Sequence, residues 1–219
     1  MTRKYFIAGF VLLAACLLAT AILYPHLPNQ VPSHWNGHGQ VDGYSARWTL
    51  FLVNPGIMLG LMGIFALLPW LSPRHFEVQT FRSTYLYIML VILAYLAFVH
   101  GLILWAAVSG AAHMDRAILG AVCLLFVLLG NVMGKVRRNF YIGIRTPWSI
   151  ADERVWNATH RLGGKTMVAG GIAGLILALA GGIWLSIGSL LLGAVVPAIY
   201  SLVYYKKLER RGELSAGLT

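Results

Sequence analysis

Charged side chains are scarce in this sequence, and acidic ones are the scarcest. Of 219 residues only 11% are charged, and seven Asp and Glu residues stand against seventeen Lys and Arg residues. A water-soluble globule needs more polar surface than this, because 58% of the residues are hydrophobic and the mean hydropathy is +0.73. The composition therefore predicts an integral membrane protein. The net charge of +10 then indicates basic loops facing anionic lipid, and no direct nucleic-acid partner is predicted.

Cysteine is also rare. The two cysteines, Cys16 and Cys123, both fall inside long apolar segments. At such positions plain packing is favoured over a disulfide, a metal pair or a reactive thiol. We therefore expect neither residue to take part in chemistry.

Long stretches without charge divide the chain into six apolar segments. The first follows Arg3 and Lys4, and it is too long and too apolar for a cleaved signal sequence. We predict transmembrane helices at residues 5–24, 50–71, 85–108, 117–133, 166–185 and 190–205, the last two joined by a tight turn at residues 186–189. The fold class is therefore an all-α integral membrane protein, a single domain of six helices over residues 1–219.

The basic residues are shared unequally between the two sides of this predicted bundle. With the N-terminus in the cytoplasm, fifteen of the seventeen Lys and Arg residues face inward, and Arg47 and Arg116 face outward. Bacterial membranes retain basic loops on the cytoplasmic side. We therefore predict that both termini are cytoplasmic, with a basic cytoplasmic loop at residues 134–164 and an exocytoplasmic loop at residues 24–48.

Small residues recur at four-residue spacing in two of the predicted spans. Small residues at this spacing let helix backbones approach closely, so we expect them to join helices within the chain. They are Gly170, Gly174, Ala178 and Gly182 in the fifth span and Gly130 and Gly134 at the end of the fourth.

The exocytoplasmic loop is rich in proline and glycine, which excludes a regular helix. Within it His34, His38 and Asp42 follow one another at four-residue intervals, a spacing that on a helix would present three metal ligands on one face. The glycines between them argue against that helix, and no cysteine supports a structural zinc site. The favoured interpretation is a compact cap hydrogen-bonded through His34, Asn36 and Asp42. A metal site is the weaker alternative, and no cofactor is predicted.

The cytoplasmic loop carries seven basic residues among aromatics, glycines and acids, a pattern more typical of a folded site than of a tether. Ser149 and Asp152 have the spacing of a capping box, and they predict a short amphipathic helix over residues 150–162 that ends at a glycine pair. Membrane orientation alone explains most of the cations. For Arg145, between a glycine and a proline, the alternative is a forked contact with a carboxylate, and Glu153 is the expected partner.

Both loops resemble motifs of one known family. The outer loop is similar to the extracytoplasmic motif of the DUF1648 family, and the inner loop resembles the signature of the SdpI family, the immunity proteins for the sporulation-delaying toxin. The outer resemblance rests on Tyr24-Pro25, Leu27-Pro28, Val31-Pro32, His34-Trp35-Asn36, Gly39 and Asp42-Gly43. The inner resemblance rests on Gly130-Asn131, Lys135, Asn139, Gly143-Ile144-Arg145-Thr146-Pro147-Trp148, Glu153, Val155-Trp156 and Thr159-His160-Arg161.

This resemblance implies a multi-pass bacterial inner-membrane protein. The best-known member of the family protects the cell from a secreted membrane-active peptide, and it holds a transcriptional repressor at the membrane once toxin is present. We therefore expect three partners: a secreted peptide toxin, membrane lipids and a cytoplasmic transcriptional repressor. The residues expected to bind the peptide are His34, Trp35, Asn36 and Asp42. The residues expected to contact the cytoplasmic partner or lipid are Lys135, Arg137, Asn139, Arg145, Trp148, Glu153, Trp156, His160 and Arg161.

Two other functions stay open at this point. A transporter or ion pathway has little support, because no acid lies in mid-membrane and the strongly polar side chains in or near the spans are Asn54, His100 and Asn131. A metal-dependent membrane enzyme would use His34 with Asp42, or Glu153 with His160, as acid–base or metal groups. Neither pair comes with a nucleophile or with the spacing of a metalloprotease helix, so we predict no enzyme.

Overall fold

The computed structural model of the chain describes residues 3–37, 39–72, 78–110 and 114–214. Within these ranges, six helices are long and apolar enough to cross a membrane, which confirms the predicted class. They are α1 (Arg3–Leu23), α2 (Val53–Leu71), α3 (Arg82–Ser109), α4 (Asp115–Met133), α6 (Glu153–Leu179) and α7 (Ile183–Arg210). The shorter elements are α5 (Pro147–Ala151), the 3-10 turns η1 (Tyr24–His26), η2 (Arg47–Phe51) and η4 (Val78–Phe81), and the strands β1 (Gln30–Trp35) and β2 (Val41–Ala46).

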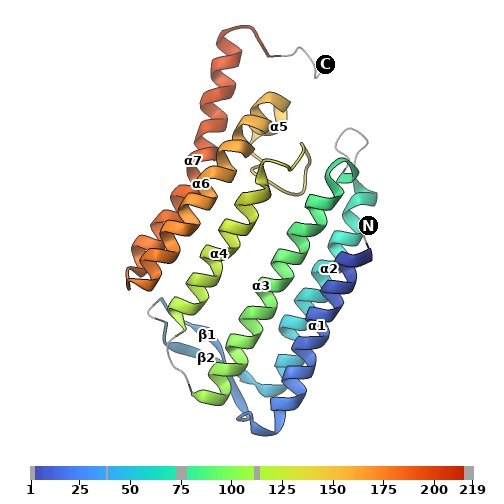
Figure 1. The fold of residues 1–219 in the computed structure, drawn as a ribbon, viewed down its shortest axis with the longest axis vertical. Coiled ribbons are helices and arrows are strands. Elements are labelled where there is room, and N and C mark those ends of the chain that lie inside the picture. Colours follow the sequence, from blue (N-terminus) through green and yellow to red (C-terminus); the bar gives the residue numbers. More distant parts are fainter. Residues whose placement is uncertain (1–2, 38, 73–77, 111–113, 215–219) are drawn as a thin grey trace.

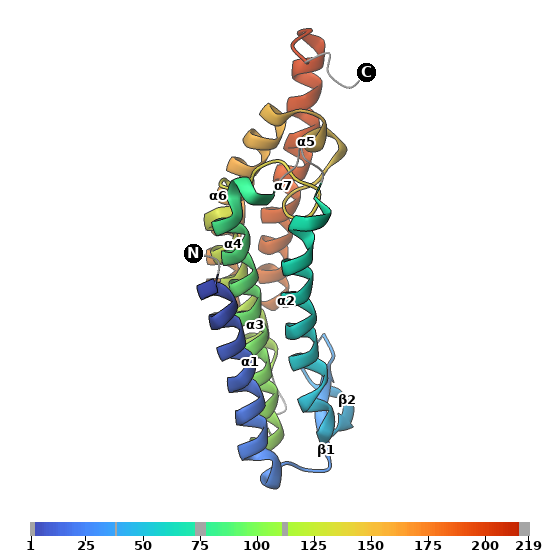
Figure 2. The same cartoon turned by 90° about the vertical axis from the view of Figure 1, so that its right-hand side faces the viewer.

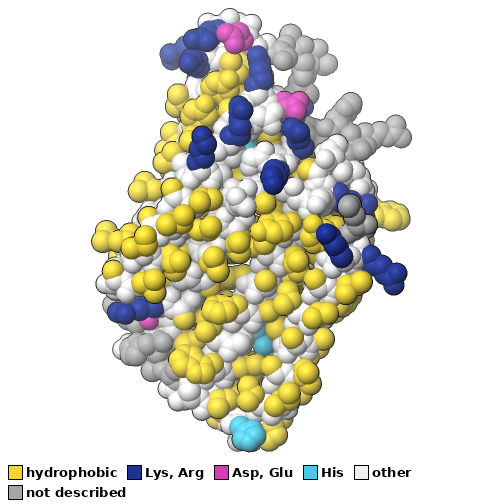
Figure 3. All heavy atoms as spheres, in the orientation of Figure 1, with side chains coloured by type: hydrophobic (Ala, Val, Ile, Leu, Met, Phe, Trp, Pro, Cys, Tyr) yellow, Lys and Arg dark blue, Asp and Glu magenta, His cyan; other side chains and the backbone are white. Residues whose placement is uncertain are grey.

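The six long helices lie side by side in an elongated bundle, with α1, α2 and α3 on one side and α4, α6 and α7 on the other (Figures 1 and 2). Hydrophobic side chains cover the shaft of the face drawn in Figure 3, and most of its Lys and Arg side chains gather at the end that carries α5. Leu18, Ile176 and Leu192 are each more than 60% exposed. Such a surface is stable in contact with lipid and costly in contact with water.

The two sides of the bundle are packed in different ways. Large side chains fill the space between α1, α2 and α3, where Met58, Met62, Tyr85, Met89 and Leu93 are almost fully buried. Each such side chain contributes roughly 1.5–3 kcal/mol when it is transferred from water to an apolar interior. Inside a bilayer the same side chains are in an apolar environment whether or not the helices are packed, so burial from water does not favour packing there. The helices are held together by the van der Waals contacts of their interdigitating side chains.

Glycines instead bring α4, α6 and α7 together. A Cβ added to Gly164 would lie 2.8 Å from the carbonyl oxygen of Gly130, and one added to Gly171 would lie 2.7 Å from that of Cys123. A Cβ on Gly170 would likewise lie 2.6 Å from the carbonyl oxygen of Ser189 on α7. These separations are too short for any side chain, so the predicted contacts within the chain are confirmed. Gly182 is the exception, because it lies in the turn before α7.

The glycine pair at residues 163–164 does not end a helix, so the predicted helix over residues 150–162 is wrong. Instead α6 runs unbroken through both glycines. A Cβ on Gly163 would lie 2.5 Å from Ile144 Cδ1, which shows that these glycines serve close packing. The turn predicted at residues 186–189 is also wrong, because the chain turns at residues 180–182. Ser186 and Ser189 lie inside α7 and donate hydrogen bonds to carbonyl oxygens of α6 over 2.7 and 3.0 Å.

The loop between α1 and α2 forms an antiparallel hairpin of β1 and β2 at the end of the bundle opposite α5 (Figure 1). Its register runs from Gln30 opposite Ala46 to Trp35 opposite Val41, with an irregularity at His34. Val31 is buried with Leu104 and Ala107 of α3, which holds the hairpin against the helix ends. This short sheet adds to the predicted all-helical fold.

Candidate functional sites

The hairpin presents one histidine–carboxylate pair to its surroundings. His34 Nδ1 lies 2.5 Å from Asp42 Oδ1, and the two side chains are 70% and 43% exposed. Gly43 makes the pairing possible, because a Cβ there would lie 2.9 Å from His34 Cβ. An exposed pair of this kind contributes only about 0–1 kcal/mol to stability. His34 and Asp42 are therefore dispensable for folding and accessible to a ligand.

The other predicted residues of the hairpin shape its tip. Asn36 Oδ1 accepts a hydrogen bond from the backbone N–H of Gln40 over 3.1 Å, as expected for a cap held by Asn36. Trp35 is half-buried, and within the described residues its indole N–H has no acceptor. The third predicted metal ligand, His38, lies outside the described residues. Among those described, no group of three or more His, Cys, Asp or Glu residues could hold a metal ion.

Two exposed aromatic residues, one on β2 and one just after it, were missed by the sequence analysis. Tyr44 is 59% exposed and Trp48 is 56% exposed. Tyr44 follows Asp42 by two residues on β2, so the two side chains share a face of the strand.

The hairpin also spans the two sides of the bundle. A Cβ on Gly39 would lie 2.6 Å from Asp115 Cβ, at the start of α4, and Gly39 has a left-handed φ of +72°. A Cβ on Gly37 would lie 4.0 Å from the Trp184 ring of α7. At the base, the Arg47 guanidinium lies 4.6 Å from the Tyr24 ring centroid, a cation–π contact. The hairpin thus connects α1 and α3 with the ends of α4 and α7.

At the opposite end, Asn139 organises the loop between α4 and α5. Its side chain is fully buried and uses all of its hydrogen-bonding capacity. Oδ1 accepts from the backbone N–H groups of Tyr141 (2.7 Å) and Ile142 (2.8 Å), and Nδ2 donates to the carbonyl oxygens of Arg137 (2.8 Å) and Ile142 (3.0 Å). A buried amide with four partners is a structural element, with no group left for a ligand.

His160 is also committed to the fold. Its Nε2 accepts a hydrogen bond from the backbone N–H of Ile144 over 3.0 Å, which requires that the ring proton sits on Nδ1. Nδ1–H donates to the carbonyl oxygen of Trp156 over 2.8 Å, and the two rings are stacked with centroids 3.9 Å apart. Gly143 lies against the ring at φ +118°, where any Cβ would overlap it. Both ring nitrogens are hydrogen-bonded within the fold, which disfavours the weaker alternative in which His160 and Glu153 act as an acid–base pair.

Helices α5 and α6 are capped by neighbouring residues. The predicted capping box of Ser149 with Asp152 is wrong. The capping box is formed by Thr146, the N-cap residue of α5, and Ser149, three residues later. Asp152 caps α6 and receives two hydrogen bonds from the Arg154 side chain, at 3.1 and 2.7 Å. These bonds hold the pKa of Asp152 below its ordinary value. Thr146 Oγ1 lies 2.7 Å from Ser201 Oγ, which ties α5 to α7.

The remaining signature residues stand at the surface of this end. Arg145 donates to the carbonyl oxygen of Phe140, so the expected forked contact with Glu153 is wrong. Glu153 forms no ion pair with any described residue. Lys135, Arg137 and Arg161 are exposed, Trp148 is half-buried, and Trp156 is buried with its indole N–H donating to the Val136 carbonyl oxygen over 2.8 Å.

The polar residues of the spans mostly fasten helices together. Asn54 Nδ2 donates to the carbonyl oxygen of Leu96 over 2.8 Å, joining α2 to α3. His100 Nε2 lies 2.8 Å from Thr20 Oγ1, joining α3 to α1. Asn131 on α4 differs, because its side chain is exposed and has no hydrogen-bond partner among the described residues.

Two family models match this chain. The model of the SdpI/YfhL protein family matches residues 135–201, and a domain of unknown function, DUF1648, matches residues 11–59. The chain is also 28% identical over 205 residues to the immunity protein SdpI of Bacillus subtilis (strain 168), which covers 92% of this chain and 96% of that protein. The chain therefore resembles the SdpI/YfhL protein family over its C-terminal half and the immunity protein SdpI over most of its length. No solved structure matches it.

Each candidate site falls within one of these matches. The hairpin lies inside the DUF1648 match, and the loop before α5, all of α6 and the first two-thirds of α7 lie inside the SdpI/YfhL match. The similarity to the immunity protein SdpI and the six helices that are long and apolar enough to cross a membrane support a multi-pass protein of the cell membrane.

Proposed function

We propose that this protein is an immunity protein that protects its cell from a secreted membrane-active peptide. The observation that carries the proposal is the similarity to the immunity protein SdpI, which extends over almost the full length of both chains and includes both candidate sites. The role is a binding role without catalysis. His34 and Asp42 lack a nucleophile beside them, and His160 has no free ring nitrogen.

The hairpin is the proposed receiver of the peptide, and it faces the outside of the cell. Of the described Lys and Arg residues, all but Arg47 and Arg116 lie at the α5 end, which favours a cytoplasmic position for that end. The exposed pair of His34 and Asp42, with Tyr44 alongside, offers charge and an aromatic face to a peptide that arrives from outside.

Cysteine labelling tests this orientation. In a variant with Cys16 and Cys123 replaced by alanine, an impermeant thiol reagent should label Gln30→Cys in intact cells and should label Phe140→Cys only after the cells are opened. Both positions are exposed in the structure. Labelling of Phe140→Cys from outside intact cells would reverse the orientation.

The peptide-binding role is tested by survival. The chain is expressed in a Bacillus subtilis strain that lacks its own SdpI and is challenged with the sporulation-delaying peptide. The wild-type chain should protect, and His34→Ala and Asp42→Ala should lower protection at unchanged abundance. Gln30→Ala is the matched control, since Gln30 is exposed on the same hairpin and away from the pair. Full protection by both pair variants would remove the hairpin from the mechanism.

A cytoplasmic repressor is the proposed partner of the α5 end. Lys135, Arg137 and Arg145 leave three cations exposed there, and Trp148 adds a half-buried indole. A two-hybrid assay against the transcriptional repressor that the best-known member of the family holds at the membrane should report binding that Arg137→Ala weakens. Binding that is unaffected by Arg137→Ala together with Lys135→Ala would exclude this surface.

A further inference from the structure

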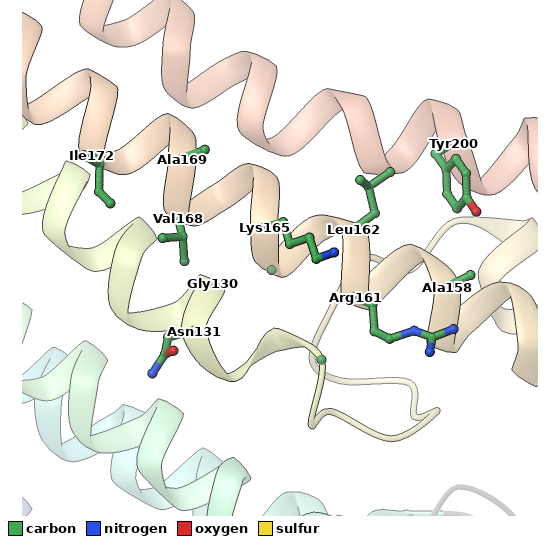
Figure 4. A pocket seen from close by; sticks show the side chains of 12 residues that line it. Gly130, Asn131, Ala158, Arg161, Leu162, Lys165, Val168, Ala169, Ile172 and Tyr200 are labelled. Carbon is green, nitrogen blue, oxygen red and sulfur yellow. The ribbon is translucent and has the colours of Figure 1, made fainter.

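A groove of about 890 Å³ opens on the face of α4 and α6 near the α5 end (Figure 4). Glycines make its floor, because Gly130 and Gly164 pack backbone against backbone and leave no side chain between the helices. Asn131 lies on its α4 wall. Its α6 wall carries Arg161, Lys165, Val168 and Ile172, which share one helix face by their three- and four-residue spacings.

Three polar side chains on the walls of this groove have no partner among the residues that the structure describes. Arg161, Lys165 and Asn131 are exposed, and none forms an ion pair or hydrogen bond with a described residue. The acids that do form ion pairs are engaged elsewhere: Asp42 with His34, Asp152 with Arg154, Glu209 with Lys206 and Glu213 with Arg211. Two cations and an amide donor at the edge of a membrane protein favour an anion as their ligand.

The order of residues along α6 identifies the kind of anion. The wall is charged at Arg161 and Lys165 and apolar at Val168 and Ile172, so polarity falls steadily away from the α5 end. From residue 161 to residue 172 a helix rises about 16 Å, which is enough for a headgroup and the first part of an acyl chain. A free phosphate would leave the apolar half of the groove empty, and an acidic peptide would place backbone polar groups against it.

We propose that this groove binds one anionic phospholipid. Its phosphate lies between Arg161, Lys165 and the amide of Asn131, and one acyl chain lies over Gly164 and Val168. This inference does not depend on the immunity function. The proposed orientation of the bundle places the lipid in the cytoplasmic leaflet, where anionic headgroups attract basic residues.

Lipid retention tests the proposal on the full chain. The protein is purified in detergent with phosphatidylglycerol or with phosphatidylcholine of the same acyl chains, and bound lipid is counted by native mass spectrometry. We expect phosphatidylglycerol to be retained roughly tenfold or more better than phosphatidylcholine. The double variant R161Q/K165Q should lose this preference. R161K should keep it, because a phosphate accepts hydrogen bonds from either cation.

The double variant K207Q/R210Q is the matched control. It removes two exposed cations from α7 at the same end, so general attraction to anionic lipid falls equally while the groove stays intact. The control should keep the preference for phosphatidylglycerol. All variants should give the thermal unfolding curve of the wild type, since the altered side chains are exposed.

Four results would overturn the proposal. The first is equal retention of both lipids by the wild type, and the second is an equal loss of preference in R161Q/K165Q and K207Q/R210Q. The third is displacement of the lipid by inorganic phosphate alone, which would assign the cations to a free anion. The fourth is displacement by a short polyglutamate peptide at lower concentration than by phosphatidylglycerol, which would assign the groove to an acidic protein segment.

Discussion

The two ends of this bundle use similar residues for opposite purposes. Each has a histidine and an asparagine within its motif. At the α5 end Asn139 and His160 are buried, and every polar atom of their side chains has a partner. At the hairpin end His34 pairs with Asp42 in the open, and Asn36 lies in an exposed turn. Burial and hydrogen-bond saturation, more than residue type, separate groups that hold the fold from groups that can meet a ligand.

Substitution of Asn139 and of Asn36 should give the largest difference in stability between the two ends. Asn139→Ala leaves the N–H groups of Tyr141 and Ile142 and two carbonyl oxygens without the partner that the buried Asn139 side chain supplied. Each orphaned group costs about 1–3 kcal/mol, so we expect the free energy of unfolding to fall by roughly 3 kcal/mol or more. Asn36→Ala should cost about 1 kcal/mol or less, because water can replace its contact. Denaturant unfolding in micelles measures both, and similar losses would contradict the comparison.

Substitution of His160 and of His34 should show the same contrast between the two ends, with a smaller loss of stability. His160→Phe keeps an aromatic ring against Trp156 but leaves the N–H of Ile144 without its acceptor, and we expect a loss of about 1–3 kcal/mol. His34→Phe should change the free energy of unfolding by no more than about 1 kcal/mol while it lowers protection against the peptide. Stability and survival are measured on the same preparations. A His34 variant that unfolds more easily than the His160 variant would reverse the assignment.

The sequence predicted the six helices and their close contacts, because charge-free stretches and small-residue spacing act locally. The prediction from sequence failed at the glycine pair, because glycine can either end a helix or allow two helices to pack closely. Gly163 and Gly164 were interpreted as a helix end, but in a membrane the same residues let α6 pack against α4 and α7. The buried state of Asn139 and His160 was also out of reach, since it depends on backbone groups of residues 136–144 that fold back onto α6. The hairpin was missed because proline and glycine obscure its alternation.

The carboxylate of Asp152 makes the stability of the α5 end depend on pH. Its pKa in the folded protein lies below its ordinary value of 3.8, because Arg154 donates hydrogen bonds to it. The folded state therefore binds fewer protons than the unfolded state below about pH 5, and stability rises with pH there. We expect Asp152→Asn to unfold more easily than the wild type at pH 7, and the difference to shrink as the pH falls below 3.8. Thermal unfolding from pH 3 to pH 7 measures it, and a constant difference would exclude this cause.

Arg145→Lys should have the smallest effect on the fold. Arg145 is exposed, and among the described residues its side chain donates to one carbonyl oxygen, that of Phe140, which a lysine ammonium can also reach. Either cation counts equally towards membrane orientation. We therefore expect a change of less than about 0.5 kcal/mol in the free energy of unfolding and an unchanged labelling pattern. Weaker binding of the repressor in the two-hybrid assay, at this unchanged stability, is the expected effect of losing a forked contact to that partner. A stability loss comparable to that of the His160 variant would instead make Arg145 part of the buried network, and the division between the two groups of signature residues would fail at this position.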